Sequence, residues 1–430
     1  MCVAPSYDSL VIELLRRLNP FQTEEARHLA VLFAVVYFAQ GMYALPEQTI
    51  SITFKDRGLQ PDEVAYFFLL GSIPWFIKPA YGLISDFVPL FGSRRKSYLL
   101  LAAGLACLMG VAGGVSSEHS YWRLALIYTA MGLGLAFADV LVDALMVENG
   151  KPRGLTGAFQ SMQWAAVTCA SIAVGLLGGH FAEQRDLQAC FMVAASFPLV
   201  TLLMTAFVVR EERTRLDRGA LRDTLSALRA GLGQRPVWLV AGFIFLYAFS
   251  PSFGPAFLFY QTDVLGFSQR FIGGLNALSS VASVIGALIY APLSRRVAPR
   301  PLINLVIGIS VATTLAYLLY RGAVSAVLIH ALWGCTGMIS LLAFLDLAAK
   351  ACPNRVEATF FALLMSVNNL GVQASQSVGA HLYTVLGQGA TAYSQLVLIA
   401  AGATAAVWLL VPLVPIERIA DADRAATQAG

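Results

Sequence analysis

The sequence predicts an all-α membrane protein that crosses the bilayer about twelve times, in two pseudo-symmetric bundles of six helices. Its 430 residues are 57% apolar and only 13% charged, about half of the ~25% charge of a soluble domain. The mean hydropathy is +0.68, which leaves too little polar surface for a water-soluble particle of this size. Apolar runs of about 20 residues, enough to cross a bilayer, recur along the whole chain. Disordered chains, soluble enzymes and nucleic-acid-binding modules are therefore excluded.

Twelve apolar runs can be placed in order, and polar residues interrupt the second, fifth, eighth and eleventh. The predicted spans are 29–53, 63–85, 98–115, 122–147, 154–179, 188–209, 237–260, 269–292, 301–320, 323–349, 356–386 and 391–414. The most hydrophilic stretch, 210–235, is predicted to be a cytoplasmic linker between an N-terminal half at 28–209 and a C-terminal half at 236–414. Segments 1–27 and 415–430 are expected to be cytoplasmic.

The basic residues support this topology. With both termini on the cytoplasmic side, 22 of the 29 Lys and Arg residues fall in inner segments, six in outer segments and Lys78 within a span. Cytoplasmic loops of membrane proteins carry such an excess of basic residues. An odd number of spans would destroy the asymmetry.

A faint internal repeat favours two related halves. The segment 81–86 (YGLISD) is similar to 290–295 (YAPLSR), 209 residues later, and Asp143 and Asp346 lie 203 residues apart in the fourth and tenth spans. Related halves with a site at their interface are the usual plan of a secondary transporter.

No motif for a metal, a cofactor or an enzyme is found. The six cysteines are scattered without a CxxC pair, and the five histidines are distant from one another in sequence. The spacing therefore gives no zinc site. We expect no metal ion and no cofactor, and membrane-embedded catalysis is disfavoured.

Charges within spans are costly and by default functional. Asp139 and Asp143 are four residues apart and so share a helical face. Because two like charges raise each other's proton affinity, both are candidate proton carriers, and the alternative is a structural ion pair with Lys78. Glu47, which follows a helix-breaking Pro46, is a third candidate for proton coupling, or else a residue at the membrane interface.

Polar and aromatic side chains at helical spacing complete the candidate substrate site. Gln163 lies on the fifth span, and Asn369 and Gln373 form a stripe on the eleventh. Such stripes face a water-filled cavity or bond helix to helix. Trp164 and Tyr247 are candidates for stacking on a flat ligand, with ordinary packing as the alternative. We predict that all five bind substrate, together with Lys78, Asp139 and Asp143.

The loop between the second and third spans has the most specific local pattern. Gly82 is placed for a close helix approach, Asp86 follows it, and the basic cluster Arg94, Arg95 and Lys96 comes next. These five residues are predicted to form a gating latch, in which Asp86 pairs with basic groups or with a helix N-terminus. The alternative is a solvated turn.

This loop resembles the G-x-x-x-D…R-R-[KR] signature of the major facilitator superfamily, with a longer gap between the acid and the basic residues. The longer stretch 74–98 (PWFIKPAYGLISDFVPLFGSRRKSY) resembles the hallmark of the folate–biopterin transporter family. Three other stretches are similar to that family: 37–41 (YFAQG), 138–148 (ADVLVDALMVE) and 352–366 (CPNRVEATFFALLMS).

The resemblance implies a major-facilitator-type fold and a secondary active transporter that moves folate, pterin or a related small solute by alternating access, often coupled to protons. Asp139 or Asp143 would then bind the pterin or carry the proton, Lys78 would neutralise an anionic group, and Trp164 would stack. The expected partners are the small-molecule substrate, protons and the lipid bilayer, with no nucleic acid. A bacterial-type inner membrane is expected, because the N-terminal segment lacks a plastid-type extension. The alternatives are a facilitator for a sugar, peptide or drug, and a non-transporting receptor or scaffold.

Overall fold

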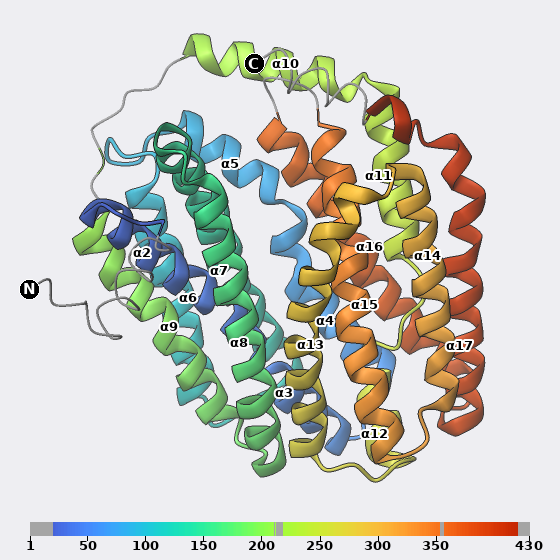
Figure 1. The fold of residues 1–430 in the computed structure, drawn as a ribbon. Coiled ribbons are helices and arrows are strands. Elements are labelled where there is room, and N and C mark those ends of the chain that lie inside the picture. Colours follow the sequence, from blue (N-terminus) through green and yellow to red (C-terminus); the bar gives the residue numbers. More distant parts are fainter. Residues whose placement is uncertain (1–19, 210, 212–217, 353–356, 420–430) are drawn as a thin grey trace, which may run out of the picture.

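The computed structural model describes residues 20–209, 211, 218–352 and 357–419, and the long elements in these ranges are all helices (Figure 1). The N-terminal half contains α2 (Glu24–Gly41), α3 (Glu47–Asp56), α4 (Pro61–Phe76), α5 (Lys78–Phe87), α6 (Lys96–Val115), α7 (Tyr121–Gly150), α8 (Thr156–Gln184) and α9 (Leu187–Val208). The linker contains α10 (Arg218–Leu232). The C-terminal half contains α11 (Arg235–Ala248), α12 (Ala256–Asp263), α13 (Gln269–Arg296), α14 (Pro299–Ala316), α15 (Ala323–Lys350), α16 (Glu357–Val385), α17 (Gly389–Ala406) and the 3-10 helix η4 (Val407–Leu413).

These elements form the twelve predicted crossings. Ten helical segments in the described part of the chain are long and apolar enough to span a membrane. The seventh crossing is divided between α11 and α12, and the eleventh is α16, whose 29 residues extend about 44 Å at 1.5 Å per residue. The prediction of an all-α protein with two six-helix bundles is confirmed, whereas the exact bounds of the two halves stay predictions.

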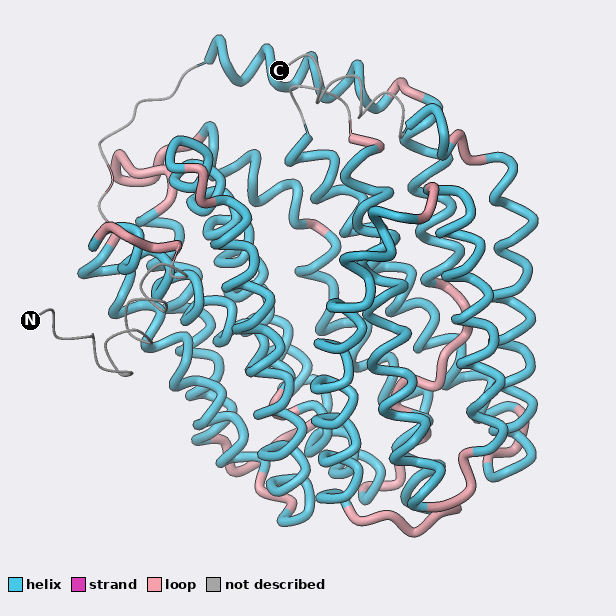
Figure 2. The backbone as a smooth tube through the Cα atoms, viewed as in Figure 1, coloured by secondary structure: helices cyan, strands magenta, loops and turns pink. Residues whose placement is uncertain are grey.

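Three crossings are broken by proline, which removes a backbone donor and clashes with the preceding turn. Pro46 precedes α3, and Pro79 is the second residue of α5, just after the break at Ile77. The residues between α11 and α12 run as a loop (Figure 2), with Gly254 at a φ of +46°. The predicted interruption of the first span at Pro46 is therefore present, and the seventh crossing is interrupted as well.

The outer surface of the bundle suits a lipid environment. Many large apolar side chains lie exposed on it, among them Leu126, Phe207, Leu328 and Leu409, which are 65–81% exposed. Exposed apolar surface on this scale marks contact with a membrane or a partner. Together with the ten spans, it identifies an integral, multi-pass membrane protein.

The two ends of the bundle differ. We call the end that carries α10 and the loop 88–95 the linker end, and the end that carries the loops 57–60 and 264–268 the far end. In Figure 1, α10 lies across the top, and α3 and α12 lie near the bottom. The described parts of the inner loops, among them 88–95 and α10, fall at the linker end.

The two halves share one hydrophobic core only toward the far end. That core contains residues of α3, α4, α7 and α8 together with residues of α12, α15, α16 and α17. Toward the linker end each half has a large core of its own, with α2, α6, α7 and α8 in one and α11, α14, α15 and η4 in the other. The halves are thus sealed together at the far end, while their linker ends pack separately.

Small residues bring the halves together where α8 crosses α13. A Cβ atom added to Gly273 would overlap the backbone carbonyl oxygen of Gly175, and one added to Gly179 would lie 2.8 Å from the Gln269 carbonyl oxygen. Gly274, the next residue on α13, has open space at the same position. Only glycine therefore allows this backbone approach at Gly273.

Candidate functional site

A buried ion pair joins α5 to α7 inside the N-terminal half. Lys78 Nζ lies 2.5 Å from Asp139 Oδ2, and the two side chains are only 15% and 5% exposed. The same ammonium lies over the ring of Trp75, 4.7 Å from its centroid. Lys78 is placed here because it is the first residue of α5 after the break in the second crossing. The structure thus brings together two of the predicted substrate-binding residues.

A second carboxylate lies one turn along the same face of α7. Asp143 Oδ1 accepts a hydrogen bond from the Tyr37 hydroxyl and a longer one of 3.5 Å from Gln163 Nε2. These donors come from α2 and α8, so Asp143 joins three helices. Gln163 was predicted for the site, whereas Tyr37 was noticed only within the family-like stretch 37–41 and had no assigned role.

This cluster, formed by Lys78, Asp139, Asp143, Tyr37 and Gln163, has an uneven charge. Two carboxylates share one ammonium, and the other two members are neutral hydrogen-bond donors. A single proton on either carboxylate would therefore balance the cluster, which gives it a chemical reason to bind a proton or a cationic group. We call it the charged cluster below.

Glu47 lies farther toward the far end, on α3. Its Oε1 atom accepts a hydrogen bond of 2.9 Å from the hydroxyl of Tyr128 on α7, and the ring of Tyr128 stacks on Tyr43 with centroids 4.4 Å apart. Tyr43 in turn lies 6.2 Å from Trp75, centroid to centroid. Glu47 therefore belongs to a polar and aromatic row that continues to Lys78, not to a bare membrane interface.

The remaining predicted ligands are distributed differently. Trp164 is 41% exposed. Tyr247 makes its contacts within the C-terminal half. Its hydroxyl forms a hydrogen bond of 2.7 Å with Ser310 Oγ, and its ring stacks on Phe344. Asn369 and Gln373 lie half-buried on α16. The structure does not link these four side chains to the charged cluster by a hydrogen bond.

Two of the predicted latch residues, Asp86 and Arg95, belong to an ion-pair network at the linker end. Arg95 Nη2 lies 2.5 Å from Asp86 Oδ1 and 2.8 Å from Glu148 Oε1, and its Nη1 donates to Ser85 Oγ. Burial lowers the pKa of Arg95, but the charges of Asp86 and Glu148 outweigh this effect and raise it overall. Arg95 thus joins the end of α5 to Glu148 on α7, a residue to which the sequence analysis gave no role.

The other latch residues have different surroundings. Lys96 Nζ donates to the Ala206 carbonyl at the end of α9, and Arg94 contributes its backbone amide to the side chain of Glu211. The expected close approach at Gly82 is wrong, because a Cβ atom there would meet only Val140 Cγ1, at an ordinary 3.7 Å. A methyl group therefore fits at Gly82 in this conformation.

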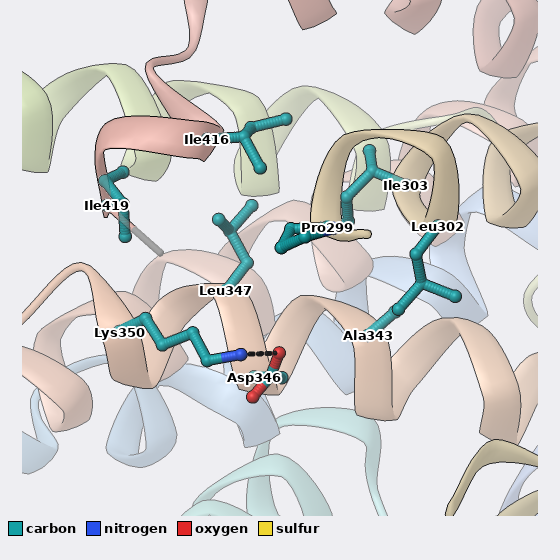
Figure 3. A pocket seen from close by; sticks show the side chains of 9 residues that line it. All are labelled: Pro299, Leu302, Ile303, Ala343, Asp346, Leu347, Lys350, Ile416 and Ile419. Carbon is teal, nitrogen blue, oxygen red and sulfur yellow. Dashed lines mark hydrogen bonds and ion pairs between the residues drawn. The ribbon is translucent and has the colours of Figure 1, made fainter. Parts of the chain in front are cut away.

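Asp346, the pseudo-symmetric counterpart of Asp143, has a different environment. It pairs with Lys350 one turn later on α15, at 2.6 Å. Figure 3 shows this pair at the edge of a small, mainly apolar pocket formed by α14, α15 and the segment after η4. The repeat in sequence is therefore not matched by a second site like the charged cluster.

A buried histidine network, which the sequence did not predict, holds α12 within the C-terminal half. Gln261 Nε2 donates to the Tyr320 hydroxyl, 2.7 Å away. That hydroxyl lies 3.2 Å from His330 Nε2, and Ser279 Oγ lies 3.1 Å from His330 Nδ1. Because Ser279 also donates to the His330 carbonyl, the pattern fits an imidazole with its proton on Nδ1. Through Tyr320 and Gln261, His330 anchors α12 at the far end.

Several polar contacts join the two halves at the far end. Lys55 Nζ lies 2.6 Å from Asp263 Oδ1, and His381 Nδ1 lies 3.1 Å from Asp62 Oδ2. Gln388 Nε2 donates to Gln60 Oε1 at 2.7 Å. Each pair has one member in each half, so these bonds must break before the far end can open.

Among the described residues, no group of His, Cys, Asp and Glu side chains is arranged to hold a metal ion.

The described helices define an integral membrane protein with the major facilitator fold. A D-xylose–proton symporter superimposes with a TM-score of 0.69 at 14% identity, covering 90% of this chain and 98% of that one. A POT family transporter, solved in complex with 5-aminolevulinic acid, gives a TM-score of 0.72 at 12% identity over 90% of this chain and 97% of that one. At these identities the likeness shows the fold alone.

The family is shown by sequence. The model of the BT1 family matches residues 40–429. A folate-biopterin transporter of Synechocystis is 33% identical over 85% of this chain and 76% of its own length, and folate transporter 2 of Plasmodium falciparum is 26% identical over 79% and 77%. The chain belongs to the BT1 family of folate–biopterin transporters, as its sequence motifs led us to expect.

Proposed function

We propose that this protein is a secondary active transporter that moves folate, pterin or a related small organic solute across a membrane by alternating access, coupled to protons. The observation that carries the proposal is the charged cluster, in which Lys78, Asp139 and Asp143 are held inside the membrane-spanning part of the molecule. Charged groups at this depth mark substrate or ion pathways. Membership of a family of transporters agrees with this role.

The distribution of the cores supports alternating access. The halves share a core and several polar contacts at the far end, and their other large cores are separate toward the linker end. This arrangement corresponds to a transporter that is closed at the far end and faces the linker end. The opposite state requires the far-end contacts to break while the linker ends approach each other.

The charged cluster fits a pterin-like or folate-like solute. A pterin offers a planar edge of donors and acceptors, which a carboxylate such as Asp143 binds with paired hydrogen bonds. The glutamyl tail of a folate is anionic, and Lys78 is the cation of the charged cluster that would pair with it. The partly exposed ring of Trp164 on α8 is the aromatic group on which a flat solute would stack.

The uneven charge of the cluster supplies a reason for proton coupling. An anionic solute that approaches two carboxylates and one ammonium meets net repulsion. A proton on Asp139 or Asp143 removes that repulsion, so proton and anionic solute favour each other's binding. Glu47, bonded to Tyr128 on the same row, is the third group we assign to proton movement.

We assign the linker end, with both termini, to the cytoplasm, and the protein to a bacterial-type inner membrane. The excess of basic residues at that end supports the orientation. In this orientation the transporter faces the cytoplasm in the present conformation, and Asp86, Arg94, Arg95 and Lys96 form its cytoplasmic gate.

Uptake into proteoliposomes tests the function. Labelled folate and biopterin are offered with and without an inward proton gradient, beside a panel of sugars, peptides and drugs. We expect accumulation of folate or biopterin that the gradient increases. Accumulation of a panel solute instead would support the alternative facilitator, and the absence of any flux with fully folded protein would support a receptor or scaffold.

A further inference from the structure

One carboxylate at the start of the linker holds the first turn of α6. Glu211 Oε1 accepts from the backbone amides of Arg94 (2.8 Å) and Arg95 (3.1 Å). Its Oε2 accepts from the amide of Lys96 (2.9 Å) and from Ser93 Oγ (2.5 Å). The N-terminal amides of a helix have no partner within the helix, and here Glu211 supplies it.

The contact between the start of α6 and the segment from the end of α9 to Glu211 has bonds in both directions, and it is electrostatically favourable. Lys96 Nζ donates to the Ala206 carbonyl, 2.9 Å away in the last turn of α9. A carboxylate at a helix N-terminus and an ammonium at a helix C-terminus both oppose the helix dipole. Partial burial raises the pKa of Glu211, but the bonds from the Lys96 amide, Ser93 and the Arg95 amide outweigh this and lower it. Glu211 is therefore ionised and bound at neutral pH.

The opposite end of the linker is attached to the C-terminal half. In α10, a Cβ atom added to Gly231 would lie 2.5 Å from the Phe360 ring of α16. Leu228 packs against a small core of Val237 and Phe360. The linker thus has one fixed point on each half, Glu211 on the N-terminal half and α10 on the C-terminal half.

The chain between these fixed points has a limited reach. Seven peptide steps lead from Glu211 to Arg218, at most about 25 Å when fully extended, and the ten residues of α10 from Arg218 to Leu228 add about 15 Å. A movement that takes the Leu228 contact more than about 40 Å from Glu211 must therefore pull on Glu211. The force would act on residues 93–96, which are bonded to Glu211. One of these residues is Arg95, whose side chain pairs with Asp86 and Glu148.

We propose that Glu211 is a positioning residue for transport, which clamps the linker to the start of α6 so that movement of the C-terminal half acts on the Arg95 network. The clamp limits how far the linker ends separate, and it passes the movement of one half to the gate of the other. This inference rests on the proposed alternating access. Its partners are residues of this chain, and it requires no ligand.

The variant Glu211→Gln keeps the shape of the side chain but replaces one acceptor oxygen with an amide that donates. Hydrogen exchange of the backbone amides at 94–96 should become about tenfold faster or more, as expected for the loss of bonds to a charged acceptor. Turnover of the folded transporter should fall several-fold, while the KM for solute changes little. Ser93→Ala removes one donor and should give a smaller change in the same direction.

Glu118→Gln is the matched control, because Glu118 is an exposed carboxylate of a far-end loop with no bonded partner among the described residues. It should leave both exchange and turnover unchanged. Faster exchange at 94–96 with wild-type turnover in Glu211→Gln would overturn the proposal, as would unchanged exchange. If the wild-type protein itself moves no solute, the proposed function fails instead, and the two failures are distinguishable.

Discussion

Two carboxylates, Asp139 and Asp143, share a single ammonium, Lys78, in the charged cluster, and their neighbours divide their roles. Asp139 is buried and paired with Lys78, whereas Asp143 is half-buried and bonded only to the neutral donors Tyr37 and Gln163. The unpaired charge of Asp143 makes it the better candidate for the transported proton.

We expect Asp143→Asn to abolish the dependence of uptake on the proton gradient. The amide has nearly the same shape but cannot take up a proton in this range, so the coupled step is lost. Uptake is measured in proteoliposomes at equal and unequal pH across the membrane. Gln163→Ala, which removes only a long hydrogen bond, is the control and should retain the pH dependence. Gradient-driven uptake by Asp143→Asn at the wild-type rate would end the proton-carrier assignment.

We expect Lys78→Ala to reduce the transport of folate more than that of uncharged biopterin, because only folate carries an anionic tail. The variant also leaves Asp139 as an uncompensated buried charge, at a cost of about 3–5 kcal/mol. The double variant Lys78→Ala/Asp139→Asn should recover most of this stability, measured as the melting temperature in detergent. Equal losses for the two solutes, with transport restored in the double variant, would point to a purely structural ion pair.

The Glu211 clamp predicts a specific effect of acid on stability. The pKa of Glu211 is lower in the folded protein than its ordinary value of about 4.3. Its stabilising contribution is therefore complete above that ordinary value and is lost as the pH falls through the lowered pKa. The stability difference between wild type and Glu211→Gln should be constant near neutral pH and vanish in acid. A difference that grows in acid would contradict the clamp.

At the residue scale, sequence reasoning found the acids and cations but not most of their partners. Lys78, Asp139 and Asp143 were found because a charge within an apolar span is conspicuous. Tyr37 and Glu211 were missed, since a tyrosine in a span and a glutamate in a linker have no unusual pattern until the fold brings them to their partners. Such contacts link residues more than 100 positions apart, which no local spacing reveals.

At the scale of elements, the crossing of α8 and α13 fixes how closely the halves approach. Gly175 and Gly273 meet there backbone to backbone, and the shared core continues from this contact toward the far end. The predicted spans correspond closely to the observed helices, because length and hydropathy are properties of each segment alone. Which helices cross between the halves depends on three-dimensional packing, and the sequence did not indicate it.

We expect Gly273→Ala to destabilise the conformation that is closed at the far end, because the methyl group would overlap the Gly175 carbonyl oxygen. Gly274→Ala adds the same methyl group in open space and should behave as wild type. Alkylation of a cysteine placed at Gln269 reports how open the far end is, and it should be several-fold faster in Gly273→Ala than in the control. Equal rates in the two variants would show that the crossing does not hold the far end closed.

At the scale of the whole molecule, the described structure is closed at the far end, and the proposed alternating access requires a second conformation in which that end is open. The far end is held by the shared core and by Lys55–Asp263, His381–Asp62 and Gln60–Gln388, whereas the linker end is spanned by the anchored linker. The two-bundle architecture could be predicted from hydropathy, basic residues and the faint repeat. The conformation could not be predicted, because under the proposed alternating access the same sequence forms both states.

The most direct test of alternating access is to lock the far end. Cysteines placed at Gln60 and Gln388, in a transport-competent background without native cysteines, are joined by a short cross-linker that a reductant cleaves. The account predicts that the cross-linked protein loses folate and biopterin counterflow and that reduction restores it, while single-cysteine variants are unaffected. Full counterflow in quantitatively cross-linked protein would contradict the account.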